Sequence, residues 1–244
     1  MNNEFIEQSE NILSVLIDPI YNISDTRISY IQKLINVTNI YNIDCSSSTL
    51  SLPLVDYNNN YYGSITAKNT PQVIDIPPII FNNYFINISP ILVITNQQTN
   101  DFDWTTLHEI VHLFSIGRYI ISKSYNSDTQ SVYHTFGINQ YKYNIKNNNL
   151  QVHWCEKHNG LNELITDYIT WQLVQIIYKS EIQPNYTGIQ LLQKFITTEL
   201  NFNNCIQEFV GWYFSGNIIK IKQSLLNKKF KSFEEFYFYL EKNY

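Results

Sequence analysis

The sequence predicts an α+β fold, with a small mixed or antiparallel sheet in its N-terminal half and helices in its C-terminal half. Between residues 48 and 94, short apolar runs alternate with segments rich in Asn, Asp and Pro, as in short strands joined by turns. From Gly160 onward, apolar residues recur with the period of helices. No repeat or flexible linker divides the chain, so we expect one domain over residues 1–244. Its sheet-bearing part covers residues 1–125, and its mainly helical part covers residues 126–244.

The predicted elements of the N-terminal part are one helix and four short strands. The helix begins at Ser24, a residue type that caps helix N-termini, and apolar residues at helical spacing continue it to about Val37. Apolar runs bounded by turn-forming residues then predict the strands. The predicted strands cover residues 48–55, 61–67, 72–81 and 91–94.

Helical spacing returns after the last of these strands. A helix is predicted from about Asp103 to about Ile121, with one side formed by Leu107, Val111, Phe114 and Arg118. The polar segment 124–159 predicts loops around a hairpin. The C-terminal helices are predicted to break near residues 183–184, 201–204 and 215–216.

Composition and charge indicate which kinds of molecule this chain is expected to bind and in which compartment it is expected to lie. The 16 Lys and Arg residues against 21 Asp and Glu residues give a net charge of −5, without a basic cluster, so nucleic acid is not an expected partner. No apolar run is long enough to span a membrane, and the N-terminus lacks the pattern of a signal peptide. Three widely spaced cysteines, Cys45, Cys155 and Cys205, favour a reduced compartment. A cytoplasmic location is therefore expected, leaderless export stays open, and the oligomeric state is not predicted.

The helix predicted from about Asp103 contains the motif His108-Glu109-Ile110-Val111-His112, or HExxH. Two histidines four residues apart lie on one helix face, one turn from each other, so both imidazoles can bind one Zn²⁺ ion. Glu109 is then placed to accept a proton from water beside the metal. Taken alone, the motif leaves open a helix with two partly buried histidines and no metal.

A second motif follows His112 at the start of the next predicted helix. Residues 160–167 read Gly-Leu-Asn-Glu-Leu-Ile-Thr-Asp, and Glu163 and Asp167 are four apart, so they share a helix face. The two motifs resemble those of the gluzincin metallopeptidases, the thermolysin-like group, whose second motif reads Asn-Glu-x-x-Ser-Asp. The resemblance covers the two motifs and the order of elements around them, about 80 residues of the chain.

This resemblance implies a zincin-like fold and a zinc-dependent endopeptidase that acts on a peptide or protein. It implies that Zn²⁺ is held by His108, His112 and Glu163, with Glu109 as the general base. Asp167 is expected to accept a hydrogen bond from the second nitrogen of a ligand histidine, with His108 as the expected partner. The strand at 91–94 is expected to be the edge strand along which gluzincins bind an extended peptide.

The chain departs from the gluzincin pattern downstream of the second motif. Thermolysin-like enzymes carry a later His that holds the transition-state oxyanion, whereas no His follows His158 here. A tyrosine is expected to take this role, with Tyr186 favoured over Tyr133, Tyr143 and Tyr168. His134 carries no motif but could approach a substrate. His153, Cys155 and His158 suggest a second metal site or a thiol that blocks the zinc, while a surface or structural role is the other interpretation.

Two other functions remain open at this point. One is a toxin or effector protease aimed at one host protein, as in the clostridial neurotoxin light chains, which share HExxH and a downstream Glu but are longer. The other is a binding protein that keeps the zincin fold without turnover. Glu109 argues against the second, because binding zinc does not require that carboxylate.

Overall fold

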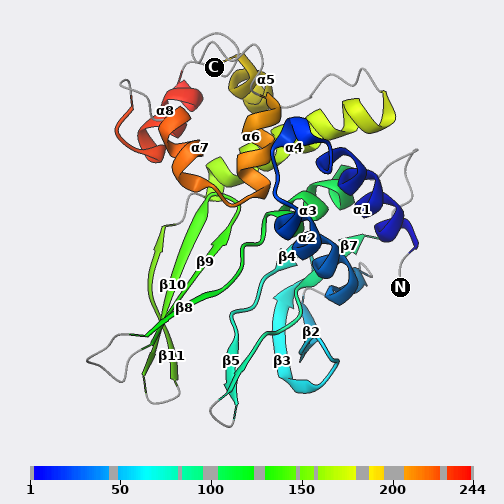
Figure 1. The fold of residues 1–244 in the computed structure, drawn as a ribbon, viewed down its shortest axis with the longest axis vertical. Helices are drawn as coiled ribbons and strands as arrows, with labels where there is room; N and C mark the ends of the chain where they lie inside the picture. Colours follow the sequence, from blue (N-terminus) through cyan, green and yellow to red (C-terminus); the bar gives the residue numbers. More distant parts are fainter. Residues whose placement is uncertain are drawn as a thin grey trace.

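The mixed α+β class expected from the sequence is confirmed by the computed structural model (Figure 1). Eight α-helices and four sheets of two to four strands occur in the residues that the structure describes. The described residues are 3–43, 49–81, 84–95, 104–123, 130–146, 149–156, 159–179, 187–194, 206–225 and 230–242.

The N-terminal segment forms two helices and a short 3₁₀ turn: α1 (Asn3–Leu16), η1 (Pro19–Tyr21) and α2 (Asp25–Val37). The Ser24 side chain accepts a hydrogen bond from the backbone N–H of Arg27, so the predicted cap is confirmed. Helix α1 was not predicted. It buries Phe5 and Ile12 together with the polar Gln8 and Ser9, and this mixture weakens the apolar period that would have identified it.

A three-stranded mixed sheet lies beneath these helices. Its order is β1 (Asn39–Ile43), β7 (Ile91–Thr95) and β4 (Gln72–Ile74), with β1 parallel and β4 antiparallel to β7. The predicted strand at 91–94 therefore exists, but the expectation that it is the edge strand is wrong. Residues 91–94 are buried and β7 has a neighbour on each side, so the edges of this sheet are β1 and β4 among the described residues.

Two antiparallel pairs extend from this sheet at the lower side of Figure 1. One pair is β2 (Thr49–Val55) with β3 (Tyr61–Lys68), as predicted, and the other is β5 (Ile79–Phe81) with β6 (Tyr84–Ile86). The single strand predicted over 72–81 is thus two strands, β4 and β5, because Pro77 and Pro78 interrupt the ladder between them.

Helix α3 (Trp104–Ser115) carries the HExxH motif and ends earlier than predicted, so Arg118 lies beyond it. The end is fixed at Gly117, whose backbone N–H donates to the Thr135 carbonyl at 2.8 Å. A Cβ atom at Gly117 would lie 2.0 Å from the Thr135 hydroxyl oxygen, so a side chain there would block this close approach. Asp103, where the helix was expected to begin, lies outside the described residues.

The segment after α3 forms a four-stranded antiparallel sheet, which corrects the prediction of loops around a hairpin over 124–159. Its order is β11 (Asn149–Glu156), β10 (Asn139–Lys146), β9 (Gln130–Phe136) and β8 (Ile120–Lys123). The small apolar cluster on this sheet centres on Val132 and Tyr143, and the strands are rich in Asn, Gln, Lys and Tyr. Such strands lack the clear alternation that identifies a half-buried sheet from sequence.

Five helices complete the chain: α4 (Asn159–Tyr178), α5 (Thr187–Lys194), α6 (Ile206–Phe214), α7 (Ile218–Leu225) and α8 (Phe233–Lys242). The prediction of helices after Gly160 is confirmed, and the break at 215–216 separates α6 from α7. The breaks near 183–184 and 201–204 lie outside the described residues. In the described parts of the chain, none of the helices has the length and apolar character needed to cross a membrane.

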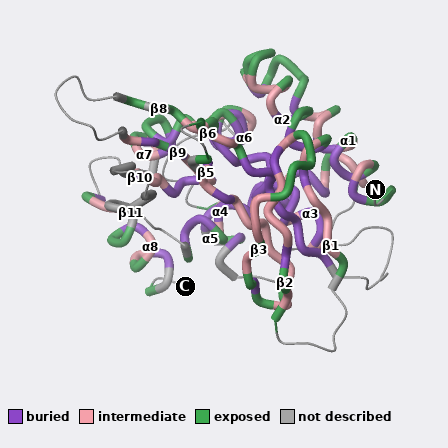
Figure 2. The backbone as a smooth tube through the Cα atoms, turned by 90° about the horizontal axis from the view of Figure 1, so that it is seen from below, coloured by how far each residue is buried: buried purple, intermediate pink, exposed green. Residues whose placement is uncertain are grey.

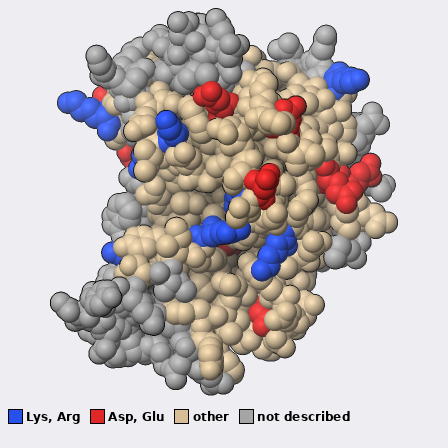
Figure 3. Space-filling model, in the orientation of Figure 1, with Lys and Arg blue, Asp and Glu red and all other residues tan. Residues whose placement is uncertain are grey.

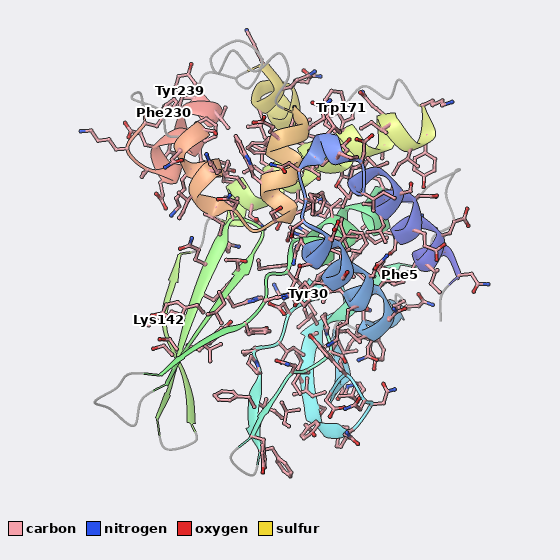
Figure 4. All side chains as sticks on the ribbon, viewed as in Figure 1. Phe5, Tyr30, Lys142, Trp171, Phe230 and Tyr239 are labelled. Carbon is pink, nitrogen blue, oxygen red and sulfur yellow. The ribbon has the colours of Figure 1, made fainter. Side chains whose placement is uncertain are left out.

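The main hydrophobic core joins α1, α2, α3, α4 and α6. Within α3, every residue from Leu107 to Ser115 except His108 is buried, and Figure 2 shows this helix among the buried segments at the centre. Phe5 of α1 and Trp171 of α4, both labelled in Figure 4, belong to the same core. The HExxH helix is therefore held on several sides by packing, which fixes the direction of its polar side chains.

Candidate metal centre

Two packed helices bring the two sequence motifs together. Helix α3 supplies His108 and His112, whose rings lie edge to face with centroids 4.6 Å apart. Helix α4 packs on α3 and supplies Glu163 and Asp167. Leu161 and Ile165 of α4 are buried, whereas the Glu163 side chain is 57% exposed, so the apolar stripe sets the direction in which the carboxylates point.

Three side-chain atoms converge at one point between these helices. The Nε2 atoms of His108 and His112 each lie 3.2 Å from the same oxygen, Oε2 of Glu163. All three atoms lie within 4.8 Å of one another, so the group could hold a metal ion. Two imidazole nitrogens and one carboxylate oxygen are a donor set that leaves an open position on a tetrahedral metal.

Asp167 contacts the His108 ring nitrogen that does not face Glu163. Its Oδ1 lies 2.7 Å from the Nδ1 atom of His108, which is the contact expected from the sequence. Both nitrogens of His108 thus face carboxylate oxygens, and the bonds to Asp167 and Glu163 outweigh desolvation and raise the pKa of His108 to about 10. A metal ion at Nε2 would displace one proton and leave the Nδ1–H bond to Asp167 in place.

His112 has a different support, which the sequence analysis missed. Its Nδ1 lies 3.4 Å from the hydroxyl of Thr166, and that hydroxyl lies 2.7 Å from the hydroxyl of Tyr213 on α6. Thr166 also donates to the Asn162 carbonyl at 2.9 Å. Thr166 stands in the second motif and could have been considered, whereas Tyr213 gives no signal because it lies 47 residues further along the chain.

Glu109 lies between the convergent atoms and the edge of the three-stranded sheet. It is buried, and its carboxylate accepts a hydrogen bond from the backbone N–H of Val73 on β4. Burial and the nearby Glu163 raise the pKa of Glu109, although His112, His108 and the Val73 bond oppose that change. Burial also disfavours ionised Glu163, but hydrogen bonds from both histidines dominate and hold its pKa well below the ordinary value.

The tyrosines proposed for oxyanion binding lie in different places. Tyr168 is fully buried in the main core, with its ring centroid 6.1 Å from that of Trp171, so it does not face solvent. Tyr143 is buried on β10, and Tyr133 is exposed on β9. Tyr186 lies outside the described residues. The assignment of an oxyanion-binding tyrosine therefore stays a prediction.

The remaining histidines and cysteines do not join this group among the described side chains. His134 lies on β9 and bonds Asp75 instead. Residues 153 and 155 belong to β11, but their side chains lie outside the described part, as do His158, Cys45 and Cys205. The alternatives raised for His153, Cys155 and His158 stay open.

Comparison with known proteins does not assign a family or a function to this site. Comparison with protein-family models, with curated proteins and with solved structures finds no match for the chain. The chemistry of the site is therefore argued from its own atoms: a possible metal-binding group of two histidines and one glutamate, with a buried carboxylate beside it.

Proposed function

We propose that this chain is a zinc-dependent hydrolase of peptide bonds, with Zn²⁺ held by His108, His112 and Glu163. The observation that carries the proposal is the convergence of two Nε2 atoms and one carboxylate oxygen, with Glu109 buried beside them. Nitrogen and oxygen ligands in this number are typical of catalytic zinc sites. Zinc, when bound, polarises a carbonyl oxygen and lowers the pKa of water toward neutrality.

Glu109 moves the proton in the proposed reaction. Its carboxylate accepts a proton from the attacking water and returns that proton to the leaving nitrogen. Its place beside the histidines suits both steps, because the same carboxyl group can accept the proton and later return it. A merely metal-binding protein would have no use for a buried carboxylate in this place, where its desolvation is costly.

A peptide is the proposed substrate because Glu109 lies close to β4, an edge strand of the three-stranded sheet. Strand β4 pairs with β7 on one side and forms the edge of its sheet on the other. Glu109 lies close enough to the backbone of Val73 on β4 for that strand to lower its pKa, against the larger effect of burial. An extended peptide can add to such an edge through main-chain hydrogen bonds and so present one of its peptide bonds beside Glu109.

The test combines metal analysis with peptide cleavage. The protein is purified with zinc present, its zinc content is measured by mass spectrometry, and it is incubated with a mixed library of quenched fluorescent peptides. We expect about one zinc per chain and cleavage that stops after chelation and returns when zinc is restored. Less than half an equivalent of zinc would contradict the metal assignment. Bound zinc without cleavage of any library peptide would favour the non-catalytic binding protein.

A further inference from the structure

A separate cavity of about 500 Å³ lies beyond the C-terminal end of α3. It is enclosed by the start of α2, the turn after α3, strands β8–β10 and the turn after α6. Its size is that of pockets that bind small organic molecules. The metal-binding group does not line it. Whatever this cavity binds is therefore a question distinct from the proposed hydrolysis.

The wall of the cavity is basic in a chain whose net charge is −5. Both arginines of the sequence, Arg27 and Arg118, line it, and none of the thirteen lining residues is Asp or Glu. Within the described residues, neither arginine forms an ion pair, since the ion pairs there all involve histidines. No carboxylate therefore lines this wall or pairs with either arginine, although Asp75 lies nearby and bonds His134.

Arg27 has a structural task that fixes its position. Its guanidinium donates to the carbonyls of Phe114, Ile116 and Phe214, at the ends of α3 and α6. Burial lowers the pKa of Arg27 to about 10, so it remains charged at neutral pH. It contributes a fixed positive charge to the cavity wall rather than an adaptable contact.

Arg118 is the residue free to meet a ligand. It is exposed, donates to the Thr26 carbonyl at 3.1 Å, and lies 5.1 Å from the ring centroid of Tyr30. Tyr30 projects from α2 and is labelled in Figure 4. Of the five N–H donors of a guanidinium, one is used within the described residues, which leaves a fork suited to a phosphate or carboxylate group.

A neighbouring cavity extends the basic surface past Arg118. This space of about 410 Å³ is lined by Arg118, Lys33, Tyr30 and Tyr57, and again no lining residue is Asp or Glu. Figure 3 shows Lys and Arg atoms near the centre of the face that it displays, with Asp or Glu atoms beside them. The two cavities share Arg118, so an anion held there lies between two aromatic-lined spaces.

We propose that the larger cavity binds a small organic phosphate, with its phosphate group on Arg118 and its body against Tyr133. The fork of Arg118 and the fixed charge of Arg27 favour an anion, and arginine pairs with phosphate through two parallel hydrogen bonds. The Tyr133 side chain, exposed on β9, offers flat apolar surface to a planar group. Nothing in this assignment depends on zinc or on the proposed hydrolysis.

Selective labelling of arginine tests the proposal on the unmodified protein. Phenylglyoxal reacts with exposed guanidinium groups, and the chain contains only Arg118 and Arg27, so mass spectrometry of peptides reports each one separately. For AMP binding with a dissociation constant of about 1 mM, about 10 mM AMP would slow labelling of Arg118 about tenfold. Adenosine should not protect, because it lacks the phosphate. Equal labelling with and without AMP would overturn the proposal, and equal protection by inorganic phosphate would overturn the role given to the organic body.

A pair of variants sharpens the result by calorimetry with AMP. Arg118→Gln removes an exposed guanidinium and should weaken binding about tenfold or more, as expected for a hydrogen bond to a charged group. Lys68→Gln, exposed on β3, makes the same change in net charge on an element that contributes no lining residue and should leave binding unchanged. Equal affinity of the two variants for AMP would show that the anion does not lie on Arg118.

Discussion

His108 and His134 are two histidines in similar surroundings with different partners. Each is largely buried and each bonds a carboxylate, Asp167 for His108 and Asp75 for His134. The second nitrogen of His108 meets Glu163 and lies beside the equivalent nitrogen of His112, whereas the second nitrogen of His134 has no partner among the described residues. A histidine held by a carboxylate is thus not sufficient for a metal site. The convergence of several ligand atoms distinguishes the two regions.

The largest expected effect comes from removing a ligand histidine. His108→Ala should lose most of the zinc, because two ligands remain and the open site has no replacement on α3. His134→Gln should keep the zinc, because His134 is not part of the convergent group. Zinc content by mass spectrometry, with folding checked by circular dichroism, measures both. Equal loss of zinc in the two variants would show that His108 contributes no more to zinc binding than His134 does.

Glu109→Gln should abolish peptide hydrolysis while keeping the zinc. The amide has the same shape but cannot accept the proton from water, and the loss of a general base costs about 10²- to 10⁴-fold in rate. The measurement is the cleavage rate of a responsive peptide, alongside zinc content. Cleavage at the wild-type rate would show that Glu109 is not the base.

Asp167 and Asp75 provide a matched pair for the carboxylates. Asp167→Ala should weaken zinc affinity by about ten- to a hundredfold, the usual range when a ligand loses its hydrogen-bond partner. Asp75→Ala should leave zinc affinity unchanged, since its histidine lies outside the group. Competition with a chromogenic chelator gives both affinities. A silent Asp167→Ala would mean that the 2.7 Å contact to His108 does not support the metal.

The smallest effect on zinc is expected at Thr166. Its contact with His112 is long, at 3.4 Å, so Thr166→Val should reduce zinc affinity less than Asp167→Ala does. The same change removes a partner of the buried Tyr213 hydroxyl and should cost about 1–3 kcal/mol of unfolding free energy. Chemical denaturation and chelator competition separate the two effects. If Thr166→Val weakened zinc affinity more than Asp167→Ala does, the Thr166 contact with His112 would matter more for zinc binding than the Asp167 contact with His108.

Helix geometry predicts the two pairs of the possible metal-binding group, whereas the meeting of the two pairs is expected only from the resemblance of the motifs to those of the gluzincins. Residues four apart on a helix share a face, so the spacing alone pairs His108 with His112 and Glu163 with Asp167. The support of His112 by Tyr213 is not predictable in this way, since it depends on how α6 docks on α4. The same limit applies to Asp75 and His134, which are brought together from separate parts of the fold.

Some elements of the fold are likewise predictable from sequence and others are not. Helix α2 is predicted by its cap and apolar period, and β7 by its continuous apolar run, although the sequence does not reveal its central position. Helix α1 and the β8–β11 sheet escape prediction because polar side chains interrupt their apolar pattern. Local pattern therefore identifies the most apolar elements, and tertiary packing decides the order of the strands.

The β8–β11 sheet lies within the chain segment between His112 and Glu163, which are 51 positions apart. It leaves and re-enters the core where α3 ends and α4 begins, so its length is independent of the distance between the ligands. The entropy of closing a loop grows only with the logarithm of its length, and doubling it costs about 0.6 kcal/mol. The length of this sheet can therefore change by insertion or deletion while the side chains of His108, His112 and Glu163 keep their positions.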